Sequence, residues 1–329
     1  MKKQNVLALA LKPAMRVTES VGISTMLMLT AALIAMITPS AVSASSPCHA
    51  PIATRLVTGL QGAMGSTIGP DGALYVTEGA IGTISRVDPQ TGEKTTFASG
   101  LPPAIIGIGG AIDVAFIDNT AYVLVTLVND PLFPSSNVDG IYRVDGPDSF
   151  TVVADIGAFN LANPPTIQFP YFIATGLQYA LQTYRGGFLV ADSHLNRVLR
   201  VTLDGEISVL IPFDNIVPTG LAVRGNTVYM AEAGPDPHLP QNGKVVSFGA
   251  RSPTATEVAS DVPFLLDVEF GGGSLYALSH GTVDPNIDPS NAVAYTGAAR
   301  VHREHRVLRD PHRRDLEDRR RLLSALIRS

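Results

Sequence analysis

The feature that most constrains this chain is a repeated strand pattern between residues 73 and 278. In each copy an aromatic residue lies among small and aliphatic residues, as in ALYVT at 73–77 and TVYMA at 227–231. Successive aromatic positions are 47, 66, 41 and 47 residues apart, and they are Tyr75, Tyr122, Phe188, Tyr229 and Tyr276. Three of these four spacings fall near the roughly 40–50 residues that one four-stranded propeller blade occupies. The repeat therefore predicts a β-propeller.

The residues around each aromatic strand fit the same blade. A second segment in which apolar and polar residues alternate follows it, as at 84–88 and 141–145, and this period of two is typical of a sheet. A further strand closes the unit, as at 206–210, and turn dipeptides such as Asp204-Gly205 separate the strands. An insert around 164–170, read as a long loop, accounts for the 66-residue spacing.

We therefore predict an all-β propeller of four-stranded blades across residues 45–299, with about six blades expected and five recognisable, the last incomplete. The first strand of each blade should line the central channel, where crowding favours small or polar residues. Five residues fall at one equivalent place shortly before each aromatic: Ser66, Asp113, Gly176, Gly220 and Asp267.

Both ends of the repeat bear on closure of the ring. Residues 52–59 resemble a fourth strand, which predicts that they complete the last blade and leave no edge exposed. The inner strands of such a blade should come from the C-terminus, but residues 300–329 are atypical, with ten Arg against five Asp and Glu. This tail is either out of frame or truncated relative to an ancestral gene, or it forms a basic helix at 315–327 that binds an anionic partner.

The N-terminus predicts export. Basic residues at 2, 3, 12 and 16 precede an apolar core at 26–37, and small residues before Ala44 suit signal peptidase. This order is typical of a cleaved signal peptide over residues 1–44, because a membrane anchor needs about 20 apolar residues. We expect a secreted or periplasmic protein without a stable membrane span.

Charge and cysteine content exclude several classes of function. The net charge is −5 and the tail from Arg300 contributes +5, so residues 1–299 sum to −10. An acidic body argues against nucleic acid as a partner, because phosphate binding needs clustered Lys and Arg. The single cysteine, Cys48, excludes a disulfide framework and a cysteine-based zinc site.

The segment VADSHLNRVLR at 190–200 resembles the NHL repeat, and the wider frame is similar to the ScyD/ScyE family of exported NHL-like propellers. The likeness covers roughly residues 52–300, and it implies an exported NHL-like propeller. Repeat motifs of this kind establish architecture better than activity. Within the segment, Asp192 is interpreted as an acceptor of backbone N–H groups in the turn between the second and third strands.

The candidate site lies at the channel mouth. Glu78 and Glu232 end equivalent second strands, Asp113 and Asp267 lie on inner strands, and His280 ends the fifth unit. Such a set could hold Ca²⁺ or another divalent cation, which prefers oxygen ligands. Alternatively, these residues only hydrate the channel or satisfy turns.

Three functions stay open at this point. The first is a scaffold that binds a small molecule, a glycan or a protein partner at the propeller face. The second is a metal-dependent hydrolase or lactonase, by fold-level analogy with gluconolactonase-like propellers, whose central metal polarises a carbonyl. The third is a non-functional truncated propeller with an exposed, aggregation-prone edge.

The predicted signal peptide can be checked by intact mass. Protein recovered from the secretion host's periplasm or medium should begin at Ser45, because cleavage follows Ala44. A full-length product retained in the membrane fraction would contradict the prediction.

Overall fold

The computed structural model describes residues 54–166, 173–235, 238, 242–249, 252–262, 264–280 and 298–302. All of them belong to one compact unit, Pro51–Ser329. The predicted signal peptide at 1–44 and the basic segment at 315–327 lie outside the described residues. Within the described part, no helix is long and apolar enough to cross a membrane.

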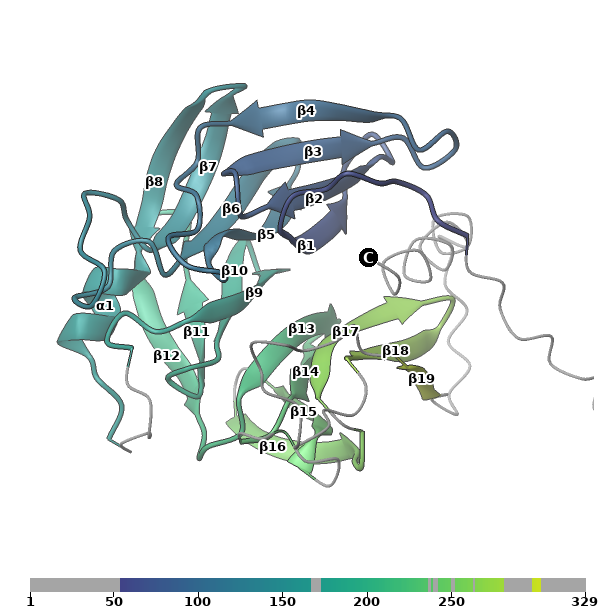
Figure 1. Ribbon diagram of the computed structural model, residues 1–329. Coiled ribbons are helices and arrows are strands. Elements are labelled where there is room, and N and C mark those ends of the chain that lie inside the picture. Colours follow the sequence, from purple (N-terminus) through teal and green to yellow (C-terminus); the bar gives the residue numbers. More distant parts are fainter. Residues whose placement is uncertain are drawn as a thin grey trace, which may run out of the picture. The chain divides into compact units, whose positions relative to one another are not determined.

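The described strands form five antiparallel sheets in chain order, four with four strands and one with three (Figure 1). Blade 1 contains β1 (Ala63–Ile68), β2 (Leu74–Glu78), β3 (Thr83–Val87) and β4 (Lys94–Ser99). Blade 2 contains β5 (Gly110–Ile117), β6 (Thr120–Thr126), β7 (Gly140–Gly146) and β8 (Ser149–Asp155). Blade 3 contains β9 (Gln178–Tyr184), β10 (Gly187–Asp192), β11 (Arg197–Val201) and β12 (Ile207–Pro212). Blade 4 contains β13 (Pro218–Arg224), β14 (Thr227–Glu232), β15 (Lys244–Gly249) and β16 (Ser252–Ala259), and blade 5 contains β17 (Leu265–Gly271), β18 (Ser274–Ser279) and β19 (Ala298–His302).

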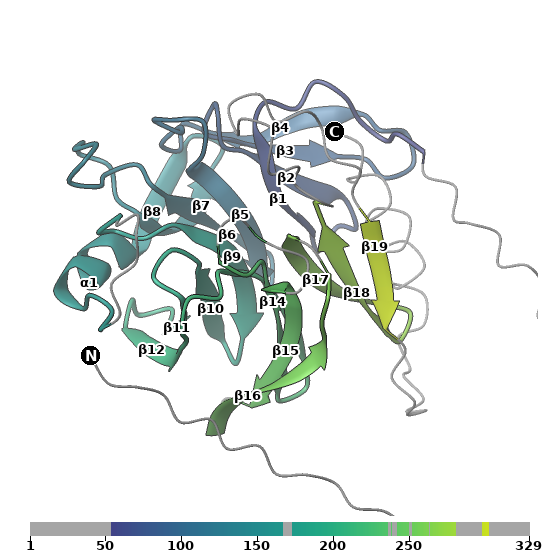
Figure 2. The ribbon, with the colours of Figure 1, turned by 60° about the horizontal axis from the view of Figure 1, so that its bottom comes forward.

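The blades are arranged as a propeller, which confirms the predicted fold class. The first strand of each blade contacts the first strand of the next, in the order β1, β5, β9, β13, β17 (Figure 2). All five predicted aromatic residues lie on the second strand of their blades, β2, β6, β10, β14 and β18. The described residues contain five blades, and the fifth has three strands there.

The insert in the 66-residue unit contains a short helix. Helix α1 (Ile156–Ala162) follows β8 directly, and the side chain of Asp155 caps it by accepting the N–H of Ala158 at 2.7 Å. This cap satisfies one of the free N–H groups at the helix start. The predicted long loop therefore begins only after a helical turn, and 167–172 lie outside the described residues.

The core consists of separate apolar layers between neighbouring blades. Blades 2 and 3, for example, enclose Leu124, Ile141 and Phe188, which are fully buried. The ring of Phe188 lies 4.9 Å from that of Tyr122 on the neighbouring blade. Equivalent layers join blades 1 and 2, 3 and 4, and 4 and 5. Each internal blade is therefore buried on both faces, which explains its mostly apolar second strand.

The chain before β1 covers the outer face of blade 1 without forming a strand. Leu56, Val57 and Leu60 pack against the buried residues Leu74, Val76 and Val87, and Lys94 Nζ donates to the carbonyl of Gly59 at 3.1 Å. The prediction of a fourth strand at 52–59 is therefore wrong over its described part, 54–59. These apolar side chains cover the blade directly.

Truncation of an aromatic side chain between two blades should destabilise the fold. Phe188→Ala should lower the free energy of unfolding by about 3–5 kcal/mol, because it leaves a cavity between two blades. Leu132→Ala, at a side chain that is 65% exposed, should change it by less than about 0.5 kcal/mol. Urea titration of both variants measures the difference. Equal effects would contradict the layered core.

Candidate functional site

A bulge interrupts each inner strand at a corresponding position. The register shifts just before Asp113, which pairs with Leu124, and again just before Asp267, which pairs with Leu278. Blade 3 has its shift before Ala180, so Ala180 and not Gly176 holds the equivalent place. Gly176 precedes β9 and has a positive φ of 77°. A bulge re-aims a side chain, and here it presents two carboxylates toward the strands around the propeller axis.

Asp113 bridges three blades. Its Oδ1 accepts the N–H of Val114 at 2.8 Å, and its Oδ2 accepts the N–H of Leu181 on the next inner strand at 2.7 Å. On the other side, a Cβ built on Gly65 of blade 1 would lie 2.3 Å from Oδ1. Blade 1 therefore needs glycine there, because any side chain would collide with the carboxylate and the adjacent backbone.

Asp267 repeats this arrangement in blade 5. Its Oδ1 accepts the N–H of Val268 at 2.8 Å, and a Cβ on Gly220 of blade 4 would lie 2.3 Å from the same oxygen. The negative charges of Glu269 and Asp113 both raise the pKa of Asp267. Asp113 and Asp267 therefore hold equivalent places at the bulges of the inner strands of blades 2 and 5.

The electrostatics of this pair favour protonation or a bound donor. Burial raises the pKa of Asp113 to about 7 against two backbone hydrogen bonds that lower it. Burial also raises the pKa of Asp267 well above its usual range, and the charges of Glu269 and Asp113 add to this rise. Within the described residues, neither Asp113 nor Asp267 forms a salt bridge.

Glu78 lies in its own polar pocket in blade 1. Its carboxylate accepts the N–H of Gln61 at 2.6 Å and the hydroxyl of Ser85, and it forms an ion pair with Lys94 at 3.3 Å. The side chain is almost fully buried. With its oxygens engaged by three donors, Glu78 holds β2, β3 and β4 to the chain before β1.

Glu232 and His280 lie elsewhere again. Burial raises the pKa of Glu232, the last residue of β14, to about 7. The His280 ring stacks on Phe264, 5.3 Å between centroids, and burial lowers its pKa. Among the described residues, no group of three or more His, Cys, Asp and Glu side chains is placed to hold a metal ion. Of the five predicted ligands, Asp113 and Asp267 lie at equivalent bulges of their inner strands.

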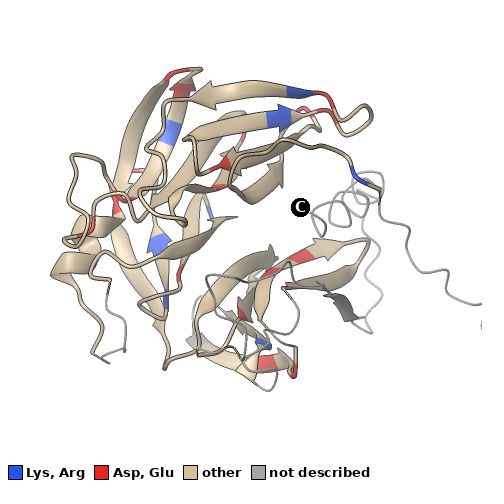
Figure 3. Cartoon of the chain, viewed as in Figure 1, with Lys and Arg blue, Asp and Glu red and all other residues tan. Residues whose placement is uncertain are grey.

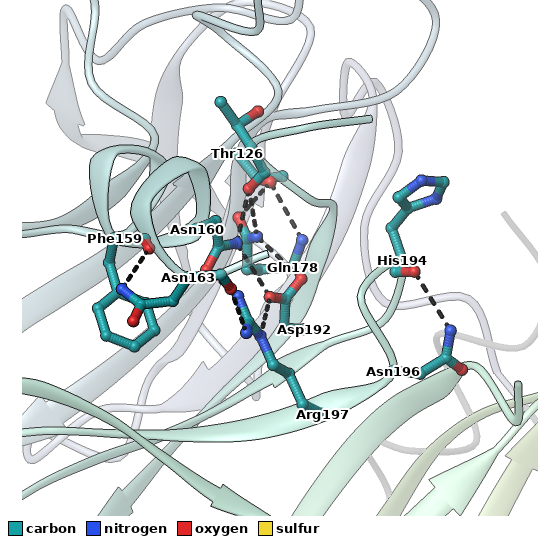
Figure 4. Close-up of polar contacts among 10 residues, drawn as sticks. Thr126, Phe159, Asn160, Asn163, Gln178, Asp192, His194, Asn196 and Arg197 are labelled. Carbon is teal, nitrogen blue, oxygen red and sulfur yellow. Dashed lines mark hydrogen bonds and ion pairs between the residues drawn. The ribbon is translucent and has the colours of Figure 1, made fainter. Parts of the chain in front are cut away.

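A second polar constellation lies buried between blades 2 and 3 (Figure 4). Asp192 accepts from Asn160 Nδ2 at 2.9 Å and from Gln178 Nε2 at 3.1 Å, and it pairs with Arg197 Nε at 3.2 Å. Thr126 completes the set by donating to Gln178 Oε1 at 2.7 Å. The interpretation of Asp192 as a turn acceptor is therefore wrong, because side-chain donors from three elements surround its carboxylate.

This network fastens helix α1 to blade 3. Arg197 donates from Nη2 to Asn160 Oδ1 at 2.7 Å and from Nη1 to the carbonyl of Asn163 at 2.8 Å. Its side chain is 5% exposed and that of Asp192 is 0% exposed. A buried ion pair whose remaining hydrogen bonds are satisfied is a structural feature. The sequence contained no signal for Asn160 or Gln178, because neither belongs to a repeated motif.

The NHL-like segment also fastens blade 3 to blade 4. Asn196 Oδ1 accepts the N–H groups of Ile216 and Val217, both at 2.7 Å. Ser193 donates to the carbonyl of Pro218, the first residue of β13. His194 accepts the N–H of Ile173 through Nε2 at 2.7 Å. The polar residues of this motif thus position neighbouring elements. The candidate site consists of the inner-strand acids instead.

Comparison with known proteins yields solved structures alone: no protein-family model and no curated protein matches the chain. A nidogen/laminin complex aligns at a TM-score of 0.47 and 16% identity, covering 67% of this chain and 73% of the other. Virginiamycin B lyase from Staphylococcus aureus aligns at 0.43 and 13%, covering 76% and 72%. A PQQ-bound aldose sugar dehydrogenase from Streptomyces coelicolor aligns at 0.45 and 17%, covering 76% and 84%.

The raised pKa values predict a pH dependence of stability. Between about pH 4 and pH 7 the folded protein binds more protons at Asp113 and Asp267 than the unfolded chain does, so the free energy of unfolding should fall as the pH rises. Asp267→Asn should flatten this slope and stabilise the protein above pH 7, because Asn can still accept the N–H of Val268.

The matched variant at the equivalent position should behave differently. Asp113→Asn has one carbonyl oxygen for the N–H groups of both Val114 and Leu181, so it should cost about 1–3 kcal/mol at low pH. Urea titrations across this pH range measure both. An unchanged slope in Asp267→Asn would contradict the assignment.

Proposed function

We propose that the protein is an exported, NHL-like binding propeller of the ScyD/ScyE type, whose ligand site is the pair Asp113 and Asp267 at the axis. The single observation that carries this proposal is that Asp113 and Asp267 occupy equivalent bulges of two inner strands and have no described cationic partner. Buried carboxylates are costly unless protons, a cation or a donor-rich ligand neutralise them.

The chemistry of the pair selects the class of ligand. Carboxylates accept hydrogen bonds, and a neutral carboxyl group also donates one. A small molecule with amine or hydroxyl groups, such as an amino sugar or a glycan end, would match both carboxyl groups, whereas an anionic ligand would be repelled. The loops around the axis would then provide further contacts, as expected for a rigid scaffold that displays loops.

The second candidate, a metal-dependent hydrolase or lactonase, has one supporting observation. Asp113 and Glu232 both have pKa values raised to about 7, where a carboxyl group can act as acid or base at neutral pH. The five predicted ligands are not assembled as one site, however, so we derive no metal-dependent step. A comparison of lactone and ester turnover with and without Ca²⁺ would test this alternative directly.

Ligand binding can be tested by thermal melting against matched sugars. Neutral and amino sugars should raise the melting temperature more than the corresponding sugar acids. The double variant Asp113→Asn, Asp267→Asn should bind the preferred sugar about 10- to 100-fold more weakly, which corresponds to the loss of one charge-assisted hydrogen bond.

Two controls accompany the test. Asp71→Asn removes the same charge from an exposed ion pair with Arg86, and it should leave binding unchanged. Elemental analysis with and without EDTA shows whether Ca²⁺ or another divalent cation is the occupant. Equal affinity in the double variant and the parent protein would overturn the proposal, and a melt that is not cooperative would favour a truncated, non-functional chain.

A further inference from the structure

Four chain segments lie at one end of blades 1 and 2. The turn at 79–82 joins β2 to β3, residues 100–109 lead from β4 to β5, and residues 127–139 join β6 to β7. Residues 156–166 follow β8 and include helix α1. Because neighbouring strands are antiparallel, all four segments lie at the ends where β2, β4, β6 and β8 finish. Together they are named the rim segments.

Backbone contacts join successive rim segments. They are the hydrogen bonds from the N–H of Ala104 to the carbonyl of Gly79 at 2.9 Å and from the N–H of Gly157 to the carbonyl of Asp139 at 2.8 Å, and the approach of Gly109 to Leu127, where an added Cβ would lie 3.1 Å from the leucine Cβ. The four segments therefore form one continuous surface.

This surface is rich in exposed apolar side chains. Among the described residues, nine large apolar side chains are at least 39% exposed, and five of them belong to the rim segments. These five are Ile81, Ile105, Ile106, Leu132 and Leu161. Apolar side chains gathered on one part of a surface mark an interaction site, whereas singly scattered ones need no explanation.

The rim segments also carry almost no charge at their surface. They contain no Lys or Arg, and their two acids, Asp130 and Asp139, are both buried. The Lys and Arg residues of blades 1 and 2 lie on β3, β4 and β7 instead (Figure 3). The turns at the opposite ends of the same blades expose four acidic residues, Asp71, Glu93, Asp118 and Asp148. Blades 1 and 2 thus have one apolar, uncharged end and one acidic end.

The size and the charge of this surface suit a second copy of the chain. At least partial exposure is found for 27 residues of the rim segments, and a standard interface takes about 20–30 residues from each partner. Two copies that meet through these segments bring uncharged surfaces together and keep their acidic turns far apart. Contact through the opposite ends would bring like charges together, which repel each other.

A lipid bilayer fits the same surface less well. The rim segments contain no Lys, Arg, Trp or Tyr, the residues that anchor proteins at the headgroups. Their irregular backbone would also leave N–H and C=O groups without partners in hydrocarbon, which costs several kcal/mol for each group. A protein interface avoids this cost, because it supplies direct hydrogen bonds and bridging waters.

We propose that the rim segments form a symmetric interface through which two copies of this chain dimerise. In a twofold contact the same surface serves both partners, so one uncharged apolar patch is sufficient. Ile105 and Ile106 act as its anchors, and the preceding Pro102 and Pro103 restrict the loop, which reduces the entropy lost on association. The interface goes beyond the ligand site at the axis and does not depend on what binds there.

Sedimentation equilibrium from micromolar to submillimolar concentrations tests the dimer. Substitution of both Ile105 and Ile106 by Ser should raise its dissociation constant about 10- to 100-fold, because two buried apolar side chains are lost. The matched control is Leu203→Ser with Val209→Ser in blade 3. Its two side chains are 41% and 39% exposed, close to 44% and 40% for the isoleucines, and its dissociation constant should equal that of the parent.

A second pair of variants gives an independent readout. Ile81→Asp introduces a charge into another rim segment and should also weaken the dimer, whereas Val152→Asp on β8, at an equally exposed position, should not. Thermal melting checks that each variant is folded. Radical labelling of the unsubstituted protein needs no variant: the labelling of Ile105 and Leu132 should fall as the dimer forms, and that of Val209 should stay constant.

The other outcomes overturn the proposal. A parent protein that stays monomeric at submillimolar concentration has no such interface. A dimer whose dissociation constant is the same in the Ile105 and Ile106 variant as in the parent would use another surface. Binding of a monomer to phosphatidylcholine vesicles, lost in the same variant, would show that lipid occupies the rim segments.

Discussion

Burial of both faces of each internal blade is the constraint on which this structure depends. A four-stranded antiparallel sheet can fold with one wet face, but the second strands here are apolar on both sides. Tyr122 meets Phe188 and Tyr229 meets Phe270 across successive blade boundaries, so each blade provides part of its neighbour's core. The propeller therefore gains its stability from nearest-neighbour interfaces, as repeat proteins do.

Polar links reinforce this apolar stack at defined points. Asp113 joins blades 2 and 3 through the N–H of Leu181, Asn196 joins blades 3 and 4, and the Asp192–Arg197 pair fastens helix α1. Each of these groups is satisfied by hydrogen bonds in directions that only one blade arrangement provides. The apolar layers drive association, whereas the buried polar links select the register between blades.

The sequence predicted the parts of the fold that repeat. The aromatic spacing located all five second strands, because each must fill the same inter-blade layer. The sequence pattern failed where residues do not repeat. Nothing in it marked Asn160 or Gln178 as partners of Asp192. It also placed Gly176 at the bulge position of blade 3, which Ala180 holds. Glu78 and Glu232 were equivalent in sequence, but the local ion pair with Lys94 gives Glu78 a structural role. Equivalence along the chain identifies a position in a blade, whereas three-dimensional neighbours determine its chemistry.

Asp113 and Asp267 show how the neighbouring strand determines the chemistry of one repeated position. Both residues follow the bulge of an inner strand, and each accepts the N–H of the next residue through Oδ1. In blade 2 the next inner strand also supplies the N–H of Leu181 to Oδ2 of Asp113. Among the described residues, Asp267 has no equivalent second hydrogen bond, and burial raises its pKa well above the usual range. Because a backbone N–H favours the ionised form of a carboxyl group, the strand that follows a blade contributes to the protonation state of the acid at its bulge.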